Sequence, residues 1–341
     1  MKERYDNLDG LRAISCLCII AMHIRANAEY NLGAVGSRIV ASWTHFVPLF
    51  LMISGLGMFC GYYERFKNGN IDLNNFYSRR YKKLLPFFIT LILIDIVLDR
   101  SLTHLIEGIT EATLVFGLLP NNQPDVIGVS WTLGVIFLFY MLFPFVVNLC
   151  WTKKRAWIVF ISSIILSLFC SLYYFTDKFV IEGFAARHNF LYCSPWFIGG
   201  GIVYLHRGAI KDFVQQNRWG WLGVCVALSV AWYFVPDDDG AIIMVKNTIL
   251  FIPWLMYAIS VDSCILSNKV MKYLSGISLE LYLAQMVMFR LIEKVHCLYL
   301  AGHGWASFML VWIGLIIGLI VFVEIWKRLW ELAQRKLKLE S

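Results

Sequence analysis

The stretch LDGLRAISCLCIIAMHI, residues 8 to 24, has the length and apolar character of a membrane span, yet it carries ionisable side chains at both ends. Asp9 and Arg12 lie near its start and His23 near its end. An Asp or Arg at the centre of a spanning helix costs ~2.5–3.5 kcal/mol on insertion scales, so ionisable residues inside spans are candidates for function. A removable signal peptide is the alternative, but these charges would interrupt its apolar run.

The composition of the whole chain is that of an integral membrane protein. Of 341 residues, 59% are hydrophobic and 16% are charged, and the mean hydropathy is +0.65, whereas soluble domains carry roughly 25% charged residues. The formal charge of +7 has to be read by its position along the chain and indicates no nucleic-acid partner. The nine cysteines form no CxxC pair and no Cys/His cluster with zinc spacing, so no metal site is expected.

Apolar windows along the chain predict an all-α, polytopic bundle of about ten transmembrane helices. A helix needs about 20 mainly apolar residues to cross the hydrocarbon, and these runs are too long and too little alternating for strands. The predicted spans lie near 8–27, 43–62, 84–98, 131–150, 156–175, 189–206, 219–235, 241–260, 273–292 and 305–326. The segment 102–120 is only half apolar and is expected to lie in the interface or to re-enter the membrane.

The distribution of Lys and Arg orients these spans. With both termini in the cytoplasm, the inner segments hold 21 of the 30 Lys and Arg, and the acidic PDDDG loop (236–240) lies outside. This bias agrees with the positive-inside rule and would reverse if 102–120 were an eleventh span. We therefore expect a single multi-pass domain over residues 1–341, placed in the plasma membrane of a bacterial-type cell.

The first predicted span places two polar residues on one face. Arg12 and His23 are eleven residues apart, about three helical turns, which separates them by ~16 Å along the axis. Arg12 is expected at the cytoplasmic mouth, where an anionic ligand could enter. A neutral imidazole at His23, nearer the outer face, could take the proton of a hydroxyl group.

A basic cluster precedes the third predicted span, in FYSRRYKKLLPFF (76–88). Arg79, Arg80 and Lys83 could bind phosphate groups, and anchoring by the positive-inside rule explains such a cluster equally well. Pro86 is expected in the first turn of the following helix, where its missing N–H costs little.

Several segments resemble, in order, those of the acyltransferase 3 family of ten-helix membrane acyltransferases. That family has an Arg, ten residues and a His in its first helix, as Arg12 and His23 do here. The other similar segments are FVPLFLMISG (46–55), with Ser54 and Gly55; RRYKKLLPFF (79–88); SWTLGVIFLFYMLFP (130–144); and LSGISLELYLAQ (274–285).

The chain departs from the family pattern at three places. Many members have Glu at the position of Ile136 or Phe137, and many end the late segment in His where this chain has Gln285. Lys83 stands where Arg is usual, which keeps the charge but loses the bidentate fork. These departures leave His23 as the strongest candidate base on the motif helices.

The resemblance implies transfer of an acyl group, usually acetyl, from cytosolic acetyl-CoA to a hydroxyl of an extracytoplasmic glycan or lipid-linked sugar. His23 and Arg12 would be catalytic, His23 either as base or as a transient acyl carrier, and Arg79, Arg80 and Lys83 would bind the acyl-CoA. The supporting residues would be Asp9, Ser54, Glu280, Gln285, His45 and Trp131.

Three other interpretations concern the same residues. A transporter or flippase for a glycan precursor or small anion could use the polar path without chemistry, and a non-catalytic partner subunit would not need His23. Gln285 could equally hold helices together. The run FIGGG (197–201) lies within a span and predicts close helix packing, not phosphate binding.

Overall fold

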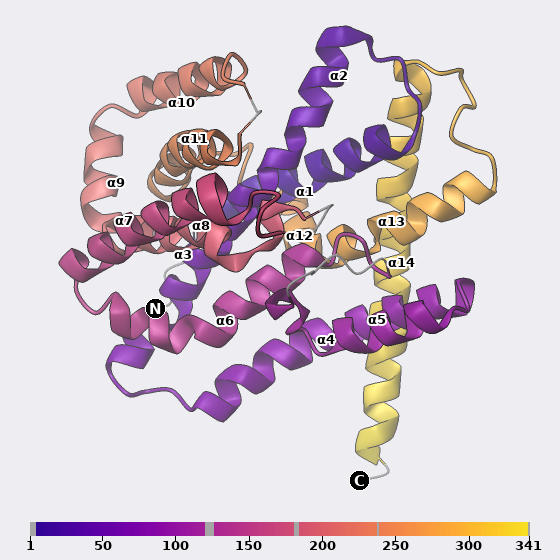
Figure 1. The fold of residues 1–341 in the computed structure, drawn as a ribbon, viewed down its shortest axis with the longest axis horizontal. Helices are drawn as coiled ribbons and strands as arrows, with labels where there is room; N and C mark the ends of the chain where they lie inside the picture. Colours follow the sequence, from indigo (N-terminus) through magenta and orange to yellow (C-terminus); the bar gives the residue numbers. More distant parts are fainter. Residues whose placement is uncertain (1–4, 120–125, 181–183, 237–238, 340–341) are drawn as a thin grey trace.

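A computed structural model describes residues 5–119, 126–180, 184–236 and 239–339 of the chain, and its described residues form helices without any strand (Figure 1). Six helices in this part are long and apolar enough to cross a membrane, or seven if one bent pair forms a single span. The protein is thus an all-helical, multi-pass membrane protein. The count of ten spans and the cytoplasmic position of both termini stay predictions.

Every predicted span falls on a helix or a bent helix pair. These are α1 (Asp6–Asn27), α3 (Phe46–Lys67), α4 (Leu73–Leu98), α6 (Trp131–Leu149), α7 (Lys153–Phe169), α8 (Phe190–Leu205), α10 (Arg218–Trp232), α11 (Gly240–Ser260), α12 (Lys269–Gly276) with α13 (Ser278–Lys294), and α14 (Trp305–Leu339). The helices α4, α8 and α10 do not meet the criteria of length and composition for a span. Three further helices are α2 (Gly33–Ser42), α5 (Leu102–Ala112) and α9 (Arg207–Gln216).

The helix α4 begins earlier than expected. The carboxylate of Asp72 accepts hydrogen bonds from the backbone N–H groups of Asn74 and Asn75, which satisfies two donors that a helix start leaves open. The basic segment therefore belongs to the helix itself, and Pro86 lies in its interior. The expectation that Pro86 occupies the first turn was wrong, because the polar residues before it continue the helix.

The ninth predicted span is broken. The helices α12 and α13 meet at an angle of 66° at Ile277, directly after Gly276. The hydroxyl of Ser278 donates to the carbonyl of Ser275 at 2.9 Å across this break, so the freed carbonyl keeps a partner. The break places the start of α13 next to α1.

The tightest packing in the fold joins α3 and α8. A Cβ added at Gly55 would lie 2.0 Å from the carbonyl oxygen of Phe197, and one added at Gly200 would lie 2.0 Å from that of Met52. Only glycine allows the two backbones to approach so closely. The packing predicted for the FIGGG run is confirmed, and its partner is the helix that carries Ser54 and Gly55.

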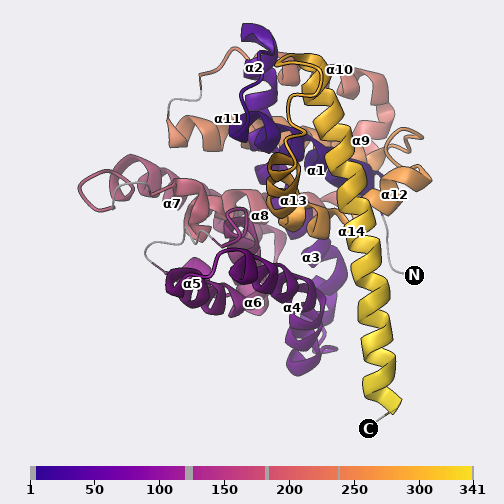
Figure 2. The same ribbon diagram turned by 90° about the vertical axis from the view of Figure 1, so that its right-hand side faces the viewer.

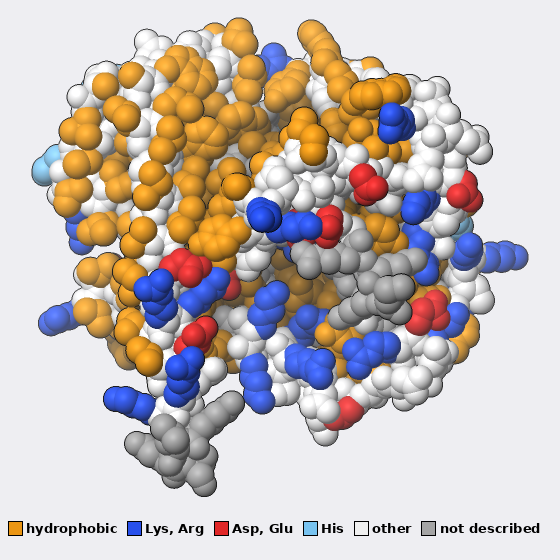
Figure 3. All heavy atoms as spheres, turned by 180° about the vertical axis from the view of Figure 1, so that it is seen from behind, with side chains coloured by type: hydrophobic (Ala, Val, Ile, Leu, Met, Phe, Trp, Pro, Cys, Tyr) orange, Lys and Arg blue, Asp and Glu red, His pale blue; other side chains and the backbone are white. Residues whose placement is uncertain are grey.

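The surface separates apolar from basic regions. Figure 2 shows α14 along one edge of the molecule, with its C-terminal end extending beyond the other helices. On the face in Figure 3, hydrophobic side chains cover the upper part, and Lys and Arg side chains gather below, towards the C-terminal end of α14. Such a division is typical of a membrane protein with one basic face.

Candidate functional site

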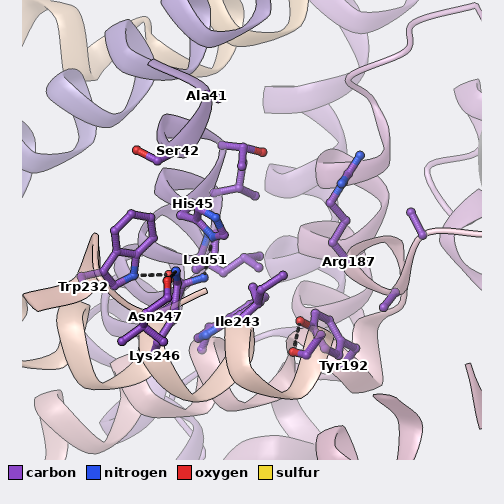
Figure 4. Close-up of a pocket in the computed structure, with 18 of the residues that line it drawn as sticks. Ala41, Ser42, His45, Leu51, Arg187, Tyr192, Trp232, Ile243, Lys246 and Asn247 are labelled. Atoms are coloured by element: carbon purple, nitrogen blue, oxygen red, sulfur yellow. Dashed lines mark hydrogen bonds between the residues drawn. The ribbon is translucent and has the colours of Figure 1, made fainter. Parts of the chain in front are cut away.

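A large cavity of about 800 Å³ opens between the starts of α3, α8 and α11 and the ends of α2 and α10 (Figure 4). We call it the large cavity. The residues that define it here are Arg38, Ser42, His45, Trp131, Arg187, Tyr192, Trp196, Trp232, Lys246 and Asn247. Its volume falls within the ~300–1,000 Å³ of ordinary small-molecule sites. Two of the sequence-predicted residues, His45 and Trp131, line it.

A hydrogen-bond chain fixes the ring of His45. The indole Nε1–H of Trp232 donates to Oδ1 of Asn247 at 3.1 Å, and Nδ2 of Asn247 lies 2.9 Å from Nδ1 of His45. Because an indole can only donate, the amide of Asn247 must donate to the imidazole. Neutral His45 consequently carries its proton on Nε2. The sequence singled out His45 but gave no sign of its two partners.

The second wall of the large cavity comes from the short turn η4 (Ala186–His188). The ring of His188 stacks on that of Trp131 at 4.6 Å, and the guanidinium of Arg187 lies 5.8 Å from the Trp131 ring. Burial and, to a smaller extent, the charge of Arg187 lower the pKa of His188 to about 3. The ring of His188 is therefore neutral and acts as a packing partner for Trp131.

A small cavity of about 140 Å³ lies between α1, α3, α4, α6 and α13. The residues that define this small cavity here are Arg12, Ser54, Arg80, Lys83, Ile136, Tyr140, Ser275, Glu280 and Tyr282. A cavity of ~150 Å³ holds a molecule of the size of benzene, so this one admits an acyl thioester but not a nucleotide. The structure thus brings together five of the sequence-predicted residues: Arg12, Ser54, Arg80, Lys83 and Glu280.

Arg80 occupies an aromatic cage in the small cavity. Its guanidinium carbon lies 4.6 Å from the ring centre of Tyr62, 5.0 Å from that of Tyr140 and 5.2 Å from that of Phe76. Its Nε and one terminal nitrogen are buried without a hydrogen-bond partner among the described residues. Rings hold a guanidinium by its face and leave its N–H groups available at the edge, so Arg80 is prepared to bind an anion.

Arg12 is positioned through a serine. The hydroxyl of Ser275 donates to a carboxylate oxygen of Asp9 at 2.8 Å, and the guanidinium of Arg12 donates to the same hydroxyl at 3.5 Å. Across the cavity, the hydroxyl of Ser54 pairs with that of Tyr140 at 3.0 Å. Asp9 thus orients Arg12 at least in part through Ser275, which the sequence did not single out.

The two cavities are neighbours in the fold and share one lining residue. Val47 lines both of them, while the neighbours Trp131 and Thr132 line the large and the small cavity respectively. The hydroxyls of Thr132 and Tyr282, both buried, form a hydrogen bond of 2.8 Å. We call Val47, Trp131, Thr132 and Tyr282 the partition between the two cavities.

Four sequence-predicted residues lie outside both cavities, and one of them is Asp9, which accepts the hydrogen bond of Ser275. Arg79 is exposed on α4, and Gln285 is buried with its Nε2–H bonded to the carbonyl oxygen of Tyr282 at 2.8 Å. His23 is half-buried on α1 and lines neither cavity. The structure therefore does not bring His23 together with the other motif residues.

A buried acid outside the predicted set supports the start of α6. Glu111, at the end of α5, accepts hydrogen bonds from the hydroxyl of Ser130 at 2.8 Å and from the N–H of Ile127 at 3.3 Å. Desolvation raises the pKa of Glu111 to about 8 against the opposing effect of these two hydrogen bonds. The residue after Ser130 is Trp131, so Glu111 helps to position the partition. No group of His, Cys, Asp and Glu among the described residues could hold a metal ion.

Fold and cavities define a multi-pass helical membrane protein with two internal cavities, each lined in part by charged side chains. A family profile described as "Acyltransferase domain" matches residues 5–326, nearly the whole chain. The chain belongs to this family, the membrane acyltransferase 3 family, as the ordered motifs of its sequence indicate.

Among curated proteins, one of Bacillus subtilis (strain 168) is similar to this chain. It is named "Putative peptidoglycan O-acetyltransferase YrhL" and is 27% identical over 183 residues. The match covers 48% of this chain and 27% of the relative, so it spans only about a quarter of that protein's length. No solved structure matches this chain.

Proposed function

We propose that this chain is an O-acyltransferase of the plasma membrane, which moves an acetyl or similarly small acyl group from cytosolic acyl-CoA to a hydroxyl of an extracytoplasmic or lipid-linked glycan. The observation that carries the proposal is the pair of cavities with the partition between them. The small cavity is lined from the N-terminal halves of α1, α4 and α13, together with residues of α3 and α6, and the large one from the starts of α3, α8 and α11. The predicted alternation of spans puts these ends on opposite sides of the membrane.

The small cavity is the proposed donor site. Arg80 offers unpartnered N–H groups, and Arg12 and Lys83 add two further cations. Arginine and lysine are the usual partners of phosphate groups. At about 140 Å³ the cavity can take the thioester end of the donor, so the nucleotide end must lie outside it, towards the basic start of α4.

The reaction that fits this arrangement is attack of a glycan hydroxyl on the thioester carbonyl. The hydroxyl oxygen forms the new C–O bond, the C–S bond breaks, and the hydroxyl proton passes to a base and then to the departing thiolate of CoA. The candidate for this base is His23 of the first-helix motif, which lines neither cavity in this structure and would have to reach the reacting hydroxyl during the reaction. A free acyl group never has to cross the bilayer, because donor and acceptor meet at the partition of Val47, Thr132 and Tyr282. This arrangement favours the acyltransferase over the transporter interpretation, because it needs no continuous path for a solute across the membrane.

The test is acetyl transfer by the purified protein in liposomes, with acetyl-CoA labelled on its acetyl group and a glycan extract as acceptor. We expect His23→Ala to abolish transfer while binding of CoA persists. Arg80→Gln should weaken CoA binding by about 10–100-fold, since hydrogen bonds to charged groups contribute ~1.5–3 kcal/mol.

The matched control is Lys82→Gln, an exposed cation on the same helix that lines neither cavity. It should bind CoA like the wild type. Full transfer activity in His23→Ala would refute the assigned base. Solute flux without any CoA binding would replace the proposal by the transporter interpretation.

A further inference from the structure

An apolar crevice borders the large cavity. It has a volume of about 300 Å³ and lies between α1, α3, α10 and α11. The residues that define the apolar crevice here are Ile14, Phe46, Leu49, Leu250, Phe251 and Trp254. Its described lining contains no Lys, Arg, Asp or Glu, in contrast to the large and the small cavity.

The crevice shares one wall with the large cavity. Ser42, His45, Trp232 and Tyr233 line both spaces, and Figure 4 shows the first three of them on one side of the large cavity, across from Arg187. The rings of His45 and Trp232, both buried, lie 4.9 Å apart and form the inner part of this wall. Ser42 and Tyr233 are only half-buried and form its edge. A ligand in the large cavity can therefore extend over this edge into the crevice.

The crevice reaches deeper into the membrane than the large cavity does. On α11, which begins on the predicted outer side, the large cavity is lined as far as Asn247 and the crevice as far as Trp254. These residues are ~10 Å apart along the helix axis. At the far end a Cβ added at Gly10 would lie 2.3 Å from the carbonyl oxygen of Leu266, which itself lines the crevice. This close contact between α1 and the segment after α11 closes the crevice there.

The polar groups in the crevice wall already have partners. The hydroxyl of Ser42 donates to a carbonyl of its own helix at 2.7 Å, and that of Ser229 does the same at 2.8 Å. The indole N–H of Trp254 donates to the Ser229 hydroxyl at 3.0 Å, and that of Trp232 donates to Asn247. A hydrocarbon chain in the crevice would therefore deprive none of these groups of a hydrogen bond.

Lipid has access to this side of the molecule beside α10. Only Cys225 and Trp232 of this helix are buried, so most of its surface faces the bilayer. The small cavity lies elsewhere, since no described residue lines both it and the crevice. A chain in the crevice therefore belongs to a ligand of the large cavity.

We propose that the acceptor is a lipid-linked glycan, whose sugar occupies the large cavity and whose hydrocarbon chain begins in the apolar crevice. The inference rests on the proposed function, in which the large cavity receives the acceptor, and it selects the lipid-linked kind. A chain gains little by moving from lipid to an equally apolar crevice. The crevice instead fixes the position of the chain, which raises the effective concentration of the attached sugar at the large cavity.

The test measures binding directly and needs no acetyl transfer. The full chain, reconstituted in phosphatidylcholine vesicles, is irradiated with dodecyl maltoside that carries a diazirine at the end of its chain, and mass spectrometry locates the label. We expect label at Ile14 and within 250–254. Phosphatidylcholine with a diazirine at the end of one chain, at equal mole fraction, should label these positions about tenfold less, because hydrogen bonds in the large cavity favour the sugar.

Variants that fill the crevice locate the effect. Leu250→Trp should reduce the label from the maltoside about tenfold, and Ile14→Trp fills the same space from α1 should the first variant not fold. The matched control is Ile249→Trp, at a neighbouring residue that is 54% exposed and does not line the crevice. It should be labelled like the wild type.

Equal labelling of the crevice by the maltoside and the phosphatidylcholine probe would overturn the proposal and identify the crevice as an ordinary lipid contact. So would labelling that Leu250→Trp and Ile14→Trp leave unchanged. Failure of the proposed function is distinguishable, because the maltoside would still label the crevice while labelled acetyl stays on CoA. Conversely, equally fast acetylation of lipid-free and lipid-linked glycans would refute only the role of the chain.

Discussion

Replacement of Gly55 by alanine is the sharpest test of the α3–α8 packing. The added Cβ would lie 2.0 Å from the carbonyl oxygen of Phe197, whereas real Cβ contacts are not shorter than 3.0 Å, so the backbones must part by at least 1.0 Å. A backbone carbonyl inside a helix cannot rotate away as a side chain does. Overpacking costs about 1–3 kcal/mol, and we expect the upper end here.

The intrinsic preference of helices for alanine offsets part of this cost, by ~1 kcal/mol. For a chain of 341 residues, a net loss of about 2 kcal/mol corresponds to a fall of ~3 °C in the unfolding midpoint. The assay heats purified protein in detergent and measures the monodisperse fraction by size-exclusion chromatography. Since Ser54 precedes Gly55 and lines the small cavity, binding of CoA should weaken in the same variant.

Gly57→Ala is the matched control on the same helix, because no atom lies within 4 Å of its added Cβ. Its midpoint should equal or slightly exceed that of the wild type. A midpoint for Gly55→Ala within 1–2 °C of that for Gly57→Ala would show that the two helices can separate freely, and would refute the reasoning.

Three further predictions concern buried polar groups. The pKa of Glu111 is raised to about 8, so folding favours its protonated form. Its contribution to the free energy of unfolding is complete below the ordinary pKa of 4.5 and is lost as the pH rises through about 8. Glu111→Gln should therefore flatten the fall in thermal stability between pH 5 and 8, and an unchanged slope would contradict this assignment. The carboxylate of Asp95, 1% exposed, accepts a hydrogen bond from Arg290 at 2.9 Å. Arg290→Met should lower the midpoint by several degrees, because among the described residues it leaves the buried carboxylate with His104 alone, whose Nδ1 lies 3.0 Å from it. Adding Asp95→Asn should restore part of the loss, since no buried carboxylate charge remains; a double variant less stable than the single one would exclude this explanation. Asn247→Leu removes the link between Trp232 and His45, and should lower acetyl transfer more than tenfold at an unchanged unfolding midpoint. A variant that loses acetyl transfer and also unfolds at a lower temperature would indicate that the link is only structural.

The sequence predicted where the helices lie but not how they are bent. Every apolar window falls on a helix or a bent helix pair, because hydrophobicity over about 20 residues is a local property. The break at Ile277 was missed, since one Gly between serines interrupts a helix only where neighbours supply partners for the freed backbone groups. The early start of α4 was missed as well, because Asp72 caps a polar stretch that the search for apolar windows passes over.

The site could be predicted in part for a similar reason. Motif residues such as Arg12, Ser54 and Arg80 lie on helices, where spacing determines direction, and the structure places them around one cavity. Arg187 lies in a turn between helices, and nothing in the local sequence shows which cavity a turn residue faces. The aromatic cage of Arg80 and the link through Asn247 likewise join segments far apart in the chain, which a single sequence cannot pair.

The partition between the cavities has a consequence for the membrane itself. In the proposed arrangement the two cavities open on opposite sides of the membrane, and only Val47, Trp131 and the bonded pair Thr132 and Tyr282 separate them. A resting voltage that normally falls over about 30 Å of hydrocarbon would then be concentrated across a few side chains. An acyltransferase built in this way must exchange donor and acceptor without opening the large and the small cavity to each other, because protons would otherwise leak across the membrane. Catalysis and ion-tightness would therefore depend on the same few atoms.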